Sequence, residues 1–190
     1  MSPILSPPHP RLMTVDEYAR LPDDGRKTEL VRGKVVEMPQ PKPQHGYLCG
    51  RVSRLLGNFV EERGLGRVLT NDAGIVTERN PDTVRGADVA YYSYQRLPKG
   101  PLPKSYLEVA PELAIEIRSP DDRWTNIRKK VAEYLTIGVI TVVVVDLEPK
   151  KVHVYSADRE DEALSGNDVL TLPEVLPGFS LPLPTMFAEA

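Results

Sequence analysis

The amino-acid sequence predicts a mixed α/β fold, in which helices pack on both faces of one mixed β-sheet. Residues 139–145 form an apolar, β-branched run of strand length, which is typical of a strand buried on both faces of a sheet. Residues 44–63 place apolar side chains three and four positions apart, which predicts an amphipathic helix. A strand, a helix and a second strand follow one another between residues 112 and 147, and this order favours a right-handed parallel crossover.

Length and composition favour a single domain. The 190 residues, 41% of them hydrophobic, are enough to bury one substantial core. The opening segment, MSPILSPPHP, contains several X-Pro steps and shows no hydrophobic periodicity. We therefore expect a disordered leader over residues 1–12 and one domain over residues 13–190.

The overall charge gives little information about partners. A formal net charge of -3 and a pI near 5.7 give the whole chain no attraction to nucleic acid, so such a contact needs a local basic cluster. Cys49 is the only cysteine, so it cannot form an internal disulfide, and it is interpreted as a small buried apolar side chain. No apolar run approaches the roughly 20 residues that span a bilayer, and a cytoplasmic setting is expected.

The N-terminal part predicts a short helix and then a hairpin. Thr14 is expected to cap a helix over residues 15–21, because Glu17 stands at the capping-box position three residues on. Residues 27–38 are expected to form a hairpin whose turn is Arg32-Gly33. A proline-rich loop then leads into the long helix.

The rest of the chain is predicted to be mainly strands. The helix over residues 44–63 is expected to end at Gly64, because glycine readily takes the left-handed conformation that follows a helix. One further helix, residues 122–138, is expected to stop at Gly138. The predicted strands cover residues 66–78 with a break near Asn71-Asp72, 85–92, 112–118, 139–147, 151–156 and 169–172.

Three acidic side chains, Glu29, Asp88 and Glu116, lie on predicted strands rather than on loops. A carboxylate among apolar residues is costly to bury unless it is paired, hydrogen-bonded or bound to a cation. Asp88 shares its strand face with Gly86 and Ala90, whose small side chains leave space for a hydrated ion or a phosphate. These acids are therefore candidate site residues.

Glu116 has a similar environment on its own strand. It shares a face with Ala114 and Arg118, because side chains two residues apart point the same way. With Asp88 on the adjacent strand, it offers two carboxylates to a Mg²⁺ ion, which prefers oxygen ligands. The residues also allow a structural explanation, in which either carboxylate forms a buried ion pair with Arg118 or Arg85. Composition and spacing leave both explanations open.

A family resemblance bears on this choice. An acid near the end of one strand, followed by an acid-x-basic triplet on the next, resembles the PD-(D/E)xK motif of restriction-endonuclease-like nucleases. More narrowly, the chain is similar to the Uma-two family of endonucleases over about residues 13–155. The segments that carry the resemblance occur in the family's order: MTVDEYARLP, TELVRGKVVEM, QHGYLCGRVSRLL, RGADVAYY, ELAIEIRSPDDR, KKVAEYLTIGV and VVVDLEPKKVHVY.

The resemblance implies a restriction-endonuclease-like mixed sheet flanked by helices, and metal-dependent hydrolysis of phosphodiester bonds in nucleic acid, with DNA as the expected substrate. It places Asp88 on the family's first metal-binding aspartate and Glu116 on its second acid. Glu29 falls on an N-terminal acid that is expected to reach the same ion directly or through a water. Mg²⁺ is the implied cofactor, Mn²⁺ is an expected substitute, and a homodimer is the expected assembly. Ala87 stands where the motif has proline.

The catalytic lysine of the motif is less direct to place. Arg118 stands where the restriction-like pattern has lysine. An arginine stays protonated, so it cannot relay a proton, although it can stabilise charge on a phosphate. In the Uma-two pattern the following helix supplies a lysine instead. Lys130 shares a helix face with Ile127 and Tyr134, whereas Lys129 points nearly the opposite way. Lys130 is therefore the predicted catalytic lysine, with Arg118 as a second stabiliser of phosphate charge.

Three further residues, His45, Arg123 and Lys129, are candidate nucleic-acid contacts. His45 matches a histidine of the family pattern, although a histidine at the start of a helix is also common on a solvated surface. Arg123 and Lys129 belong to a basic cluster around one helix. Such a cluster suits phosphate binding, and it also suits a solvated helix face.

A second function stays open beside the endonuclease. The chain could be a catalytically weak or inactive dimeric module that binds DNA or another partner and retains the nuclease fold. The motives are Arg118 in place of the usual lysine and the net negative charge. Metal binding and cleavage assays separate the two functions.

Overall fold

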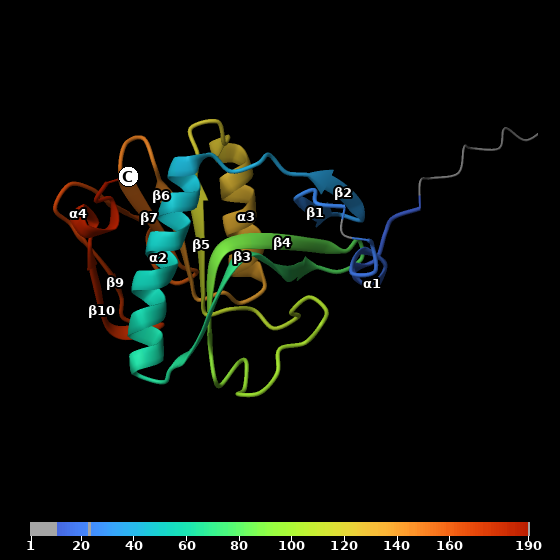
Figure 1. The fold of residues 1–190 in the computed structure, drawn as a ribbon, viewed down its shortest axis with the longest axis horizontal. Coiled ribbons are helices and arrows are strands. Elements are labelled where there is room, and N and C mark those ends of the chain that lie inside the picture. The colour runs from blue at the N-terminus through green and yellow to red at the C-terminus, as the bar shows by residue number, and fades with distance from the viewer. Residues whose placement is uncertain (1–10, 23, 190) are drawn as a thin grey trace, which may run out of the picture.

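The structure is a computed structural model that describes residues 11–22 and 24–189 (Figure 1). The predicted leader, residues 1–12, lies almost wholly outside these described residues. Among the described helices, none is both long enough and apolar enough to cross a membrane.

One large mixed sheet forms the centre of the described fold (Figure 1). Its strands are β1 (Thr28–Val31), β2 (Lys34–Glu37), β3 (Gly66–Glu78), β4 (Thr83–Ser93), β5 (Leu113–Arg118), β6 (Thr141–Asp146), β7 (Lys151–Tyr155) and β8 (Glu162–Leu164). They run in the order β2-β1-β4-β5-β6-β7-β8, and β3 pairs along β4. β5 and β6 are parallel, whereas the other neighbouring pairs are antiparallel.

In the described part of the chain, four helices accompany the sheet: α1 (Val15–Tyr18), α2 (Pro43–Glu62), α3 (Trp124–Thr136) and α4 (Leu183–Met186). The predicted capping box of α1 is confirmed, because the Thr14 hydroxyl accepts from the Glu17 amide and the Glu17 carboxylate accepts from the Thr14 amide. α2 begins with Pro43, a residue well suited to the first turn of a helix. It ends just before Gly64, whose φ of 59° is left-handed as the sequence predicts.

The two long helices cover opposite faces of the sheet, as predicted (Figure 1). One core cluster joins the apolar face of α2 to alternate residues of β4, β5 and β6: Leu48, Val52, Leu56, Val60, Val89, Ile115 and Val143. A second cluster joins α3 to the alternate residues on the other face: Ile127, Val131, Tyr134, Ala90, Ala114 and Val144. The core therefore has two layers, one on each face of the sheet. Alternate residues of each strand point into one layer or the other, and each helix buries one face in the layer that it covers.

β5, α3 and β6 form the predicted parallel crossover. Glu116 lies beside Val144 in the parallel ladder, and every residue of β6 is buried, as its apolar sequence indicates. β7 then pairs antiparallel with β6 across a short turn. This unit lays α3 across the face of β5 that carries Glu116, which determines what α3 can bring to the site.

The structure differs from the sequence expectations in the strands. β3 is continuous, and the expected break at Asn71-Asp72 is a bulge, with φ of 61° and 55° at these residues. Asn and Asp tolerate this left-handed conformation, which explains how one strand accommodates both. β9 (Val169–Leu172) and β10 (Leu176–Pro182) form a separate two-stranded sheet. That sheet packs on α2 through Phe59 and Phe179, whose ring centroids are 5.3 Å apart.

Candidate active site

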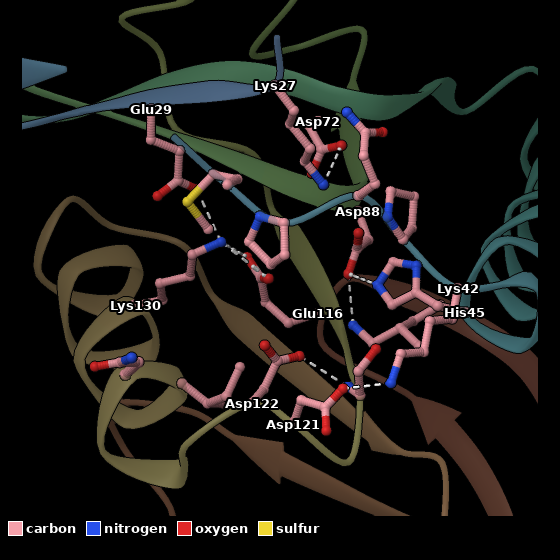
Figure 2. Close-up of a pocket in the computed structure, with 18 residues that line it drawn as sticks. Lys27, Glu29, Lys42, His45, Asp72, Asp88, Glu116, Asp121, Asp122 and Lys130 are labelled. Carbon is pink, nitrogen blue, oxygen red and sulfur yellow. Dashed lines mark hydrogen bonds and ion pairs between the residues drawn. The ribbon is translucent and has the colours of Figure 1, made fainter. Parts of the chain in front are cut away.

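A charged cavity of about 190 Å³ lies between the start of α2, strands β1, β4 and β5, and α3 (Figure 2). Six carboxylates, three lysines and a histidine line it: Glu29, Asp72, Asp88, Glu116, Asp121, Asp122, Lys27, Lys42, Lys130 and His45. The cavity therefore contains the three acids that the sequence selects, together with the predicted lysine.

The sheet register brings Asp88 and Glu116 together. The antiparallel ladder between β4 and β5 ends at Val89 and Ile115, so Asp88 and Glu116 are the next residues on each strand. Beyond this point the Asp88 side chain replaces a backbone partner, because its Oδ2 accepts a hydrogen bond of 2.7 Å from the Ile117 amide. Both carboxylates are buried, with 7% and 5% of the residue exposed.

Glu29 reaches the same cavity from β1. The Arg85 guanidinium lies 2.8 Å from its Oε2, and the Gly86 amide donates to its Oε1 over 3.2 Å. Lys130 lies 2.9 Å from Oε1. These contacts use three of the roughly four lone-pair sites of a carboxylate, so Glu29 is better placed to hold Lys130 than to bind a metal ion.

Lys130 projects from α3 between two glutamates (Figure 2). Its Nζ lies 2.9 Å from Glu29 Oε1 and 3.2 Å from Glu116 Oε2, and it donates to the Gly86 carbonyl over 3.2 Å. Burial lowers the pKa of Lys130, but the two glutamates outweigh this effect and hold it above the ordinary value. Lys130 is therefore a fixed positive charge at neutral pH and not a proton acceptor.

Glu116 has an unusual protonation equilibrium. Burial disfavours its charged form and raises its pKa to about 7, although Lys130 opposes this shift. The Tyr134 hydroxyl donates to its Oε1 over 2.7 Å. Near neutral pH the residue thus exchanges between an acid and a carboxylate, and a cation bound beside it favours the carboxylate.

The stability of the metal-free protein is expected to record this shift. The pKa of Glu116 is about 7 in the folded protein and about 4.5 ordinarily, so between these values the folded state binds more protons than the unfolded state. Its contribution to the free energy of unfolding is therefore full below pH 4.5 and is lost as the pH rises to about 7. Urea unfolding in EDTA measures this slope. Glu116→Gln is expected to flatten it, and an equal slope in the variant contradicts the raised pKa.

Asp88 is stabilised in its charged form. Burial again favours the neutral acid, but His45 and the Ile117 amide outweigh it and lower the pKa of Asp88. His45 Nε2 lies 3.4 Å from Asp88 Oδ2, and this contact raises the pKa of His45 although burial opposes it. The Ile117 amide and His45 both contact the same carboxylate oxygen of Asp88, Oδ2.

The donor set fits a hard divalent cation. Asp88 and Glu116 present carboxylate oxygens to a cavity with room for a hydrated ion, which is the environment that Mg²⁺ or Mn²⁺ prefers. Their convergence with Glu29 is incomplete, however. Among the described residues, only His45, Cys49 and Asp88 form a group of three ligand side chains with atoms all within 4.8 Å of one another.

Three candidate residues lie apart from these carboxylates. Arg118 does not line the cavity, because its guanidinium lies 2.8 Å from Asp146 on β6 and over the ring of Trp124. Arg123 and Lys129 are exposed and do not line the cavity either. His45, by contrast, is part of the lining and contacts Asp88 directly.

Arg85 does form buried ion pairs, but with acids other than Asp88 and Glu116, the two that the sequence suggested. Arg85 pairs with Glu29 and, through two contacts of 2.6 and 2.9 Å, with Glu133 on α3. Sequence reasoning missed Glu133, because 48 residues separate it from Arg85 and no local pattern links them. It also gave Tyr134 no role at the site, although the shared face with Lys130 was a usable signal.

Comparisons with known proteins agree with this architecture. Residues 15–184 match the Uma2 family, described as "Putative restriction endonuclease". A crystal structure of "a putative nuclease belonging to DUF820" from Anabaena variabilis is similar, with a TM-score of 0.82 and 22% sequence identity. The match covers 93% of this chain and 98% of that chain, so the two share a fold. No curated protein matches the chain.

Proposed function

The chain belongs to the Uma2 family of restriction-endonuclease-like proteins, and from this premise we propose that it is a metal-dependent endonuclease that cleaves DNA. The restriction-endonuclease-like fold expected from the sequence is confirmed. The observation that carries the proposal is that Asp88 and Glu116, from adjacent strands, share one cavity with Lys130. Two acids and a lysine in one cavity match what hydrolysis of a phosphodiester requires.

Each residue has a distinct role in this proposal. Asp88 and Glu116 hold Mg²⁺, which when bound polarises the phosphate and lowers the pKa of a coordinated water. Lys130 remains charged, so it stabilises negative charge on the phosphate by donating hydrogen bonds and does not abstract a proton. Glu29 positions Lys130 through the 2.9 Å contact.

One of the two motives for the second function, the replacement of the motif's lysine by Arg118, is weakened. Arg118 forms an ion pair with Asp146, whereas Lys130 of α3 lies beside Glu116. The replacement of the motif's lysine by Arg118 therefore no longer argues for an inactive module. Homodimerisation stays a prediction of the family resemblance, and size-exclusion chromatography with light scattering tests it.

Incubation of the protein with supercoiled plasmid, single-stranded DNA and RNA tests the proposal. We expect the wild type to cleave DNA in Mg²⁺ or Mn²⁺ and not in EDTA. Glu116→Gln keeps the size of the side chain and is expected to lower the rate at least about 100-fold, since it removes a metal ligand. Equal cleavage by the wild type and the variant indicates a contaminating nuclease, and DNA binding without cleavage supports the inactive module.

A further inference from the structure

A second set of metal-ligating side chains lies beside the carboxylates. Atoms of His45, Cys49 and Asp88 all lie within 4.8 Å of one another, although the proposed hydrolysis makes no use of the thiol. Cys49 Sγ lies 3.4 Å from His45 Nδ1, and His45 Nε2 lies 3.4 Å from Asp88 Oδ2. These three side chains come from two elements only, α2 and β4.

Helix geometry and a backbone hydrogen bond position these three side chains. His45 and Cys49 are four residues apart on α2, so they lie on one face of the helix, and from this face His45 contacts Asp88 of β4. The Asp88 side chain is held by the Ile117 amide. The two 3.4 Å contacts involve different ring nitrogens of His45, and one ion bonds to only one of them. The observation that supports a shared site is therefore that one ligand atom from each of the three side chains lies within 4.8 Å of the other two. Ligands bound about 2.0–2.3 Å from a tetrahedral ion lie about 3.5 Å from one another, so ion binding draws these atoms closer together.

We propose that His45, Cys49 and Asp88 form a binding site for zinc or a chemically similar transition-metal ion. A thiolate and an imidazole favour such ions, whereas Mg²⁺ prefers oxygen ligands alone. Binding displaces the proton of the Cys49 thiol and any proton on His45 to solvent, and the Cys49 sulfur then bonds to the metal. Three protein ligands leave a fourth position for water, and His45 and Asp88 both line the cavity.

Zinc at this site inhibits Mg²⁺-dependent cleavage, because both ions need Asp88. This part of the inference rests on the proposed function, whereas zinc binding itself does not. A zinc ion beside Asp88 takes the carboxylate that the hydrolytic site requires and adds positive charge where a second cation must bind.

Direct binding is tested with Co²⁺, because a cobalt-thiolate bond gives a charge-transfer band in the near ultraviolet. Under reducing conditions the wild type is expected to develop this band with one equivalent of Co²⁺ and to lose it when Zn²⁺ is added. Cys49→Ser keeps a side chain of similar size beside His45. It is expected to lack the band and to bind Zn²⁺ at least about 100-fold more weakly, while its circular dichroism is unchanged. A wild type without the band, or a variant with wild-type zinc affinity, overturns the site.

Inhibition is tested separately in the plasmid assay. Zn²⁺ is expected to stop Mg²⁺-dependent cleavage by the wild type, and Cys49→Ser is expected to cleave normally and to require at least about tenfold more zinc for the same inhibition. Equal zinc sensitivity of the two proteins overturns the inhibitory role. If neither protein cleaves DNA but the cobalt band is present, the proposed function fails and the zinc site stands.

Discussion

Replacing Asp88 with asparagine is expected to remove Mn²⁺ binding at the carboxylates and to lower the rate of DNA cleavage by about 10²–10³-fold or more. The variant loses one anionic ligand but keeps an oxygen that can accept from the Ile117 amide, as Asp88 Oδ2 does. The fold should therefore persist while the site loses its charge. Cleavage rates with Mg²⁺, and Mn²⁺ binding by titration calorimetry, measure both effects.

Asp121→Asn is the matched control for this prediction. Asp121 lines the same cavity, but its side chain is 74% exposed and pairs with the exposed Lys42. The same chemical change there is expected to leave cleavage within about twofold, because exposed ion pairs contribute little. Equal losses in the two variants contradict a specific role for Asp88 and indicate only a general charge effect.

Replacing Lys130 with methionine is expected to destabilise the protein by about 3–5 kcal/mol at pH 8, because Glu29 and Glu116 then lose their shared buried counter-charge. The loss should shrink toward pH 6. Glu116 already has a pKa raised to about 7, and removal of the ammonium raises it further, so the acid takes up a proton instead of remaining an unpaired charge. Urea unfolding at the two pH values measures the effect, and cleavage should be lost at both.

Lys129→Met provides the control. Lys129 precedes Lys130 on α3 but is exposed, so the same substitution there is expected to change stability by no more than about 0.5 kcal/mol. A loss at Lys130 that is no larger than the loss at Lys129, or that grows at lower pH, contradicts the arrangement of Lys130 between two ionised glutamates.

Hydrophobic periodicity predicts the fold where an element has one clear buried face. α2 and α3 show the helical period, and β6 shows the continuous apolar run of a central strand, and all three form as expected. The small sheet of β9 and β10 was only half predicted, because Pro177 and Gly178 interrupt the pattern of β10. Short, interrupted strands depend on packing partners that are distant in the sequence.

The site was predictable as far as strand and helix faces determine it. The face of α3 selects Lys130 over Lys129, and the period of β5 places Glu116 toward α3. The same period places Arg118 on that face too, yet Asp146 at the end of β6 pairs with it instead. Asp146 is 28 residues from Arg118 in the sequence. Whether Arg118 pairs with Asp146 or points to Glu116 depends on the tertiary structure, which the strand period does not determine. For the same reason, the sequence did not predict the contact between His45 and Asp88.

Anomalous diffraction at the manganese edge, from a crystal soaked in Mn²⁺, tests the central claim most directly. We expect one strong peak in the cavity, within bonding distance of a carboxylate oxygen of Asp88 and one of Glu116, with Lys130 beside it. A cavity without manganese at Mn²⁺ concentrations that support cleavage, or a peak that contacts neither carboxylate, contradicts the account.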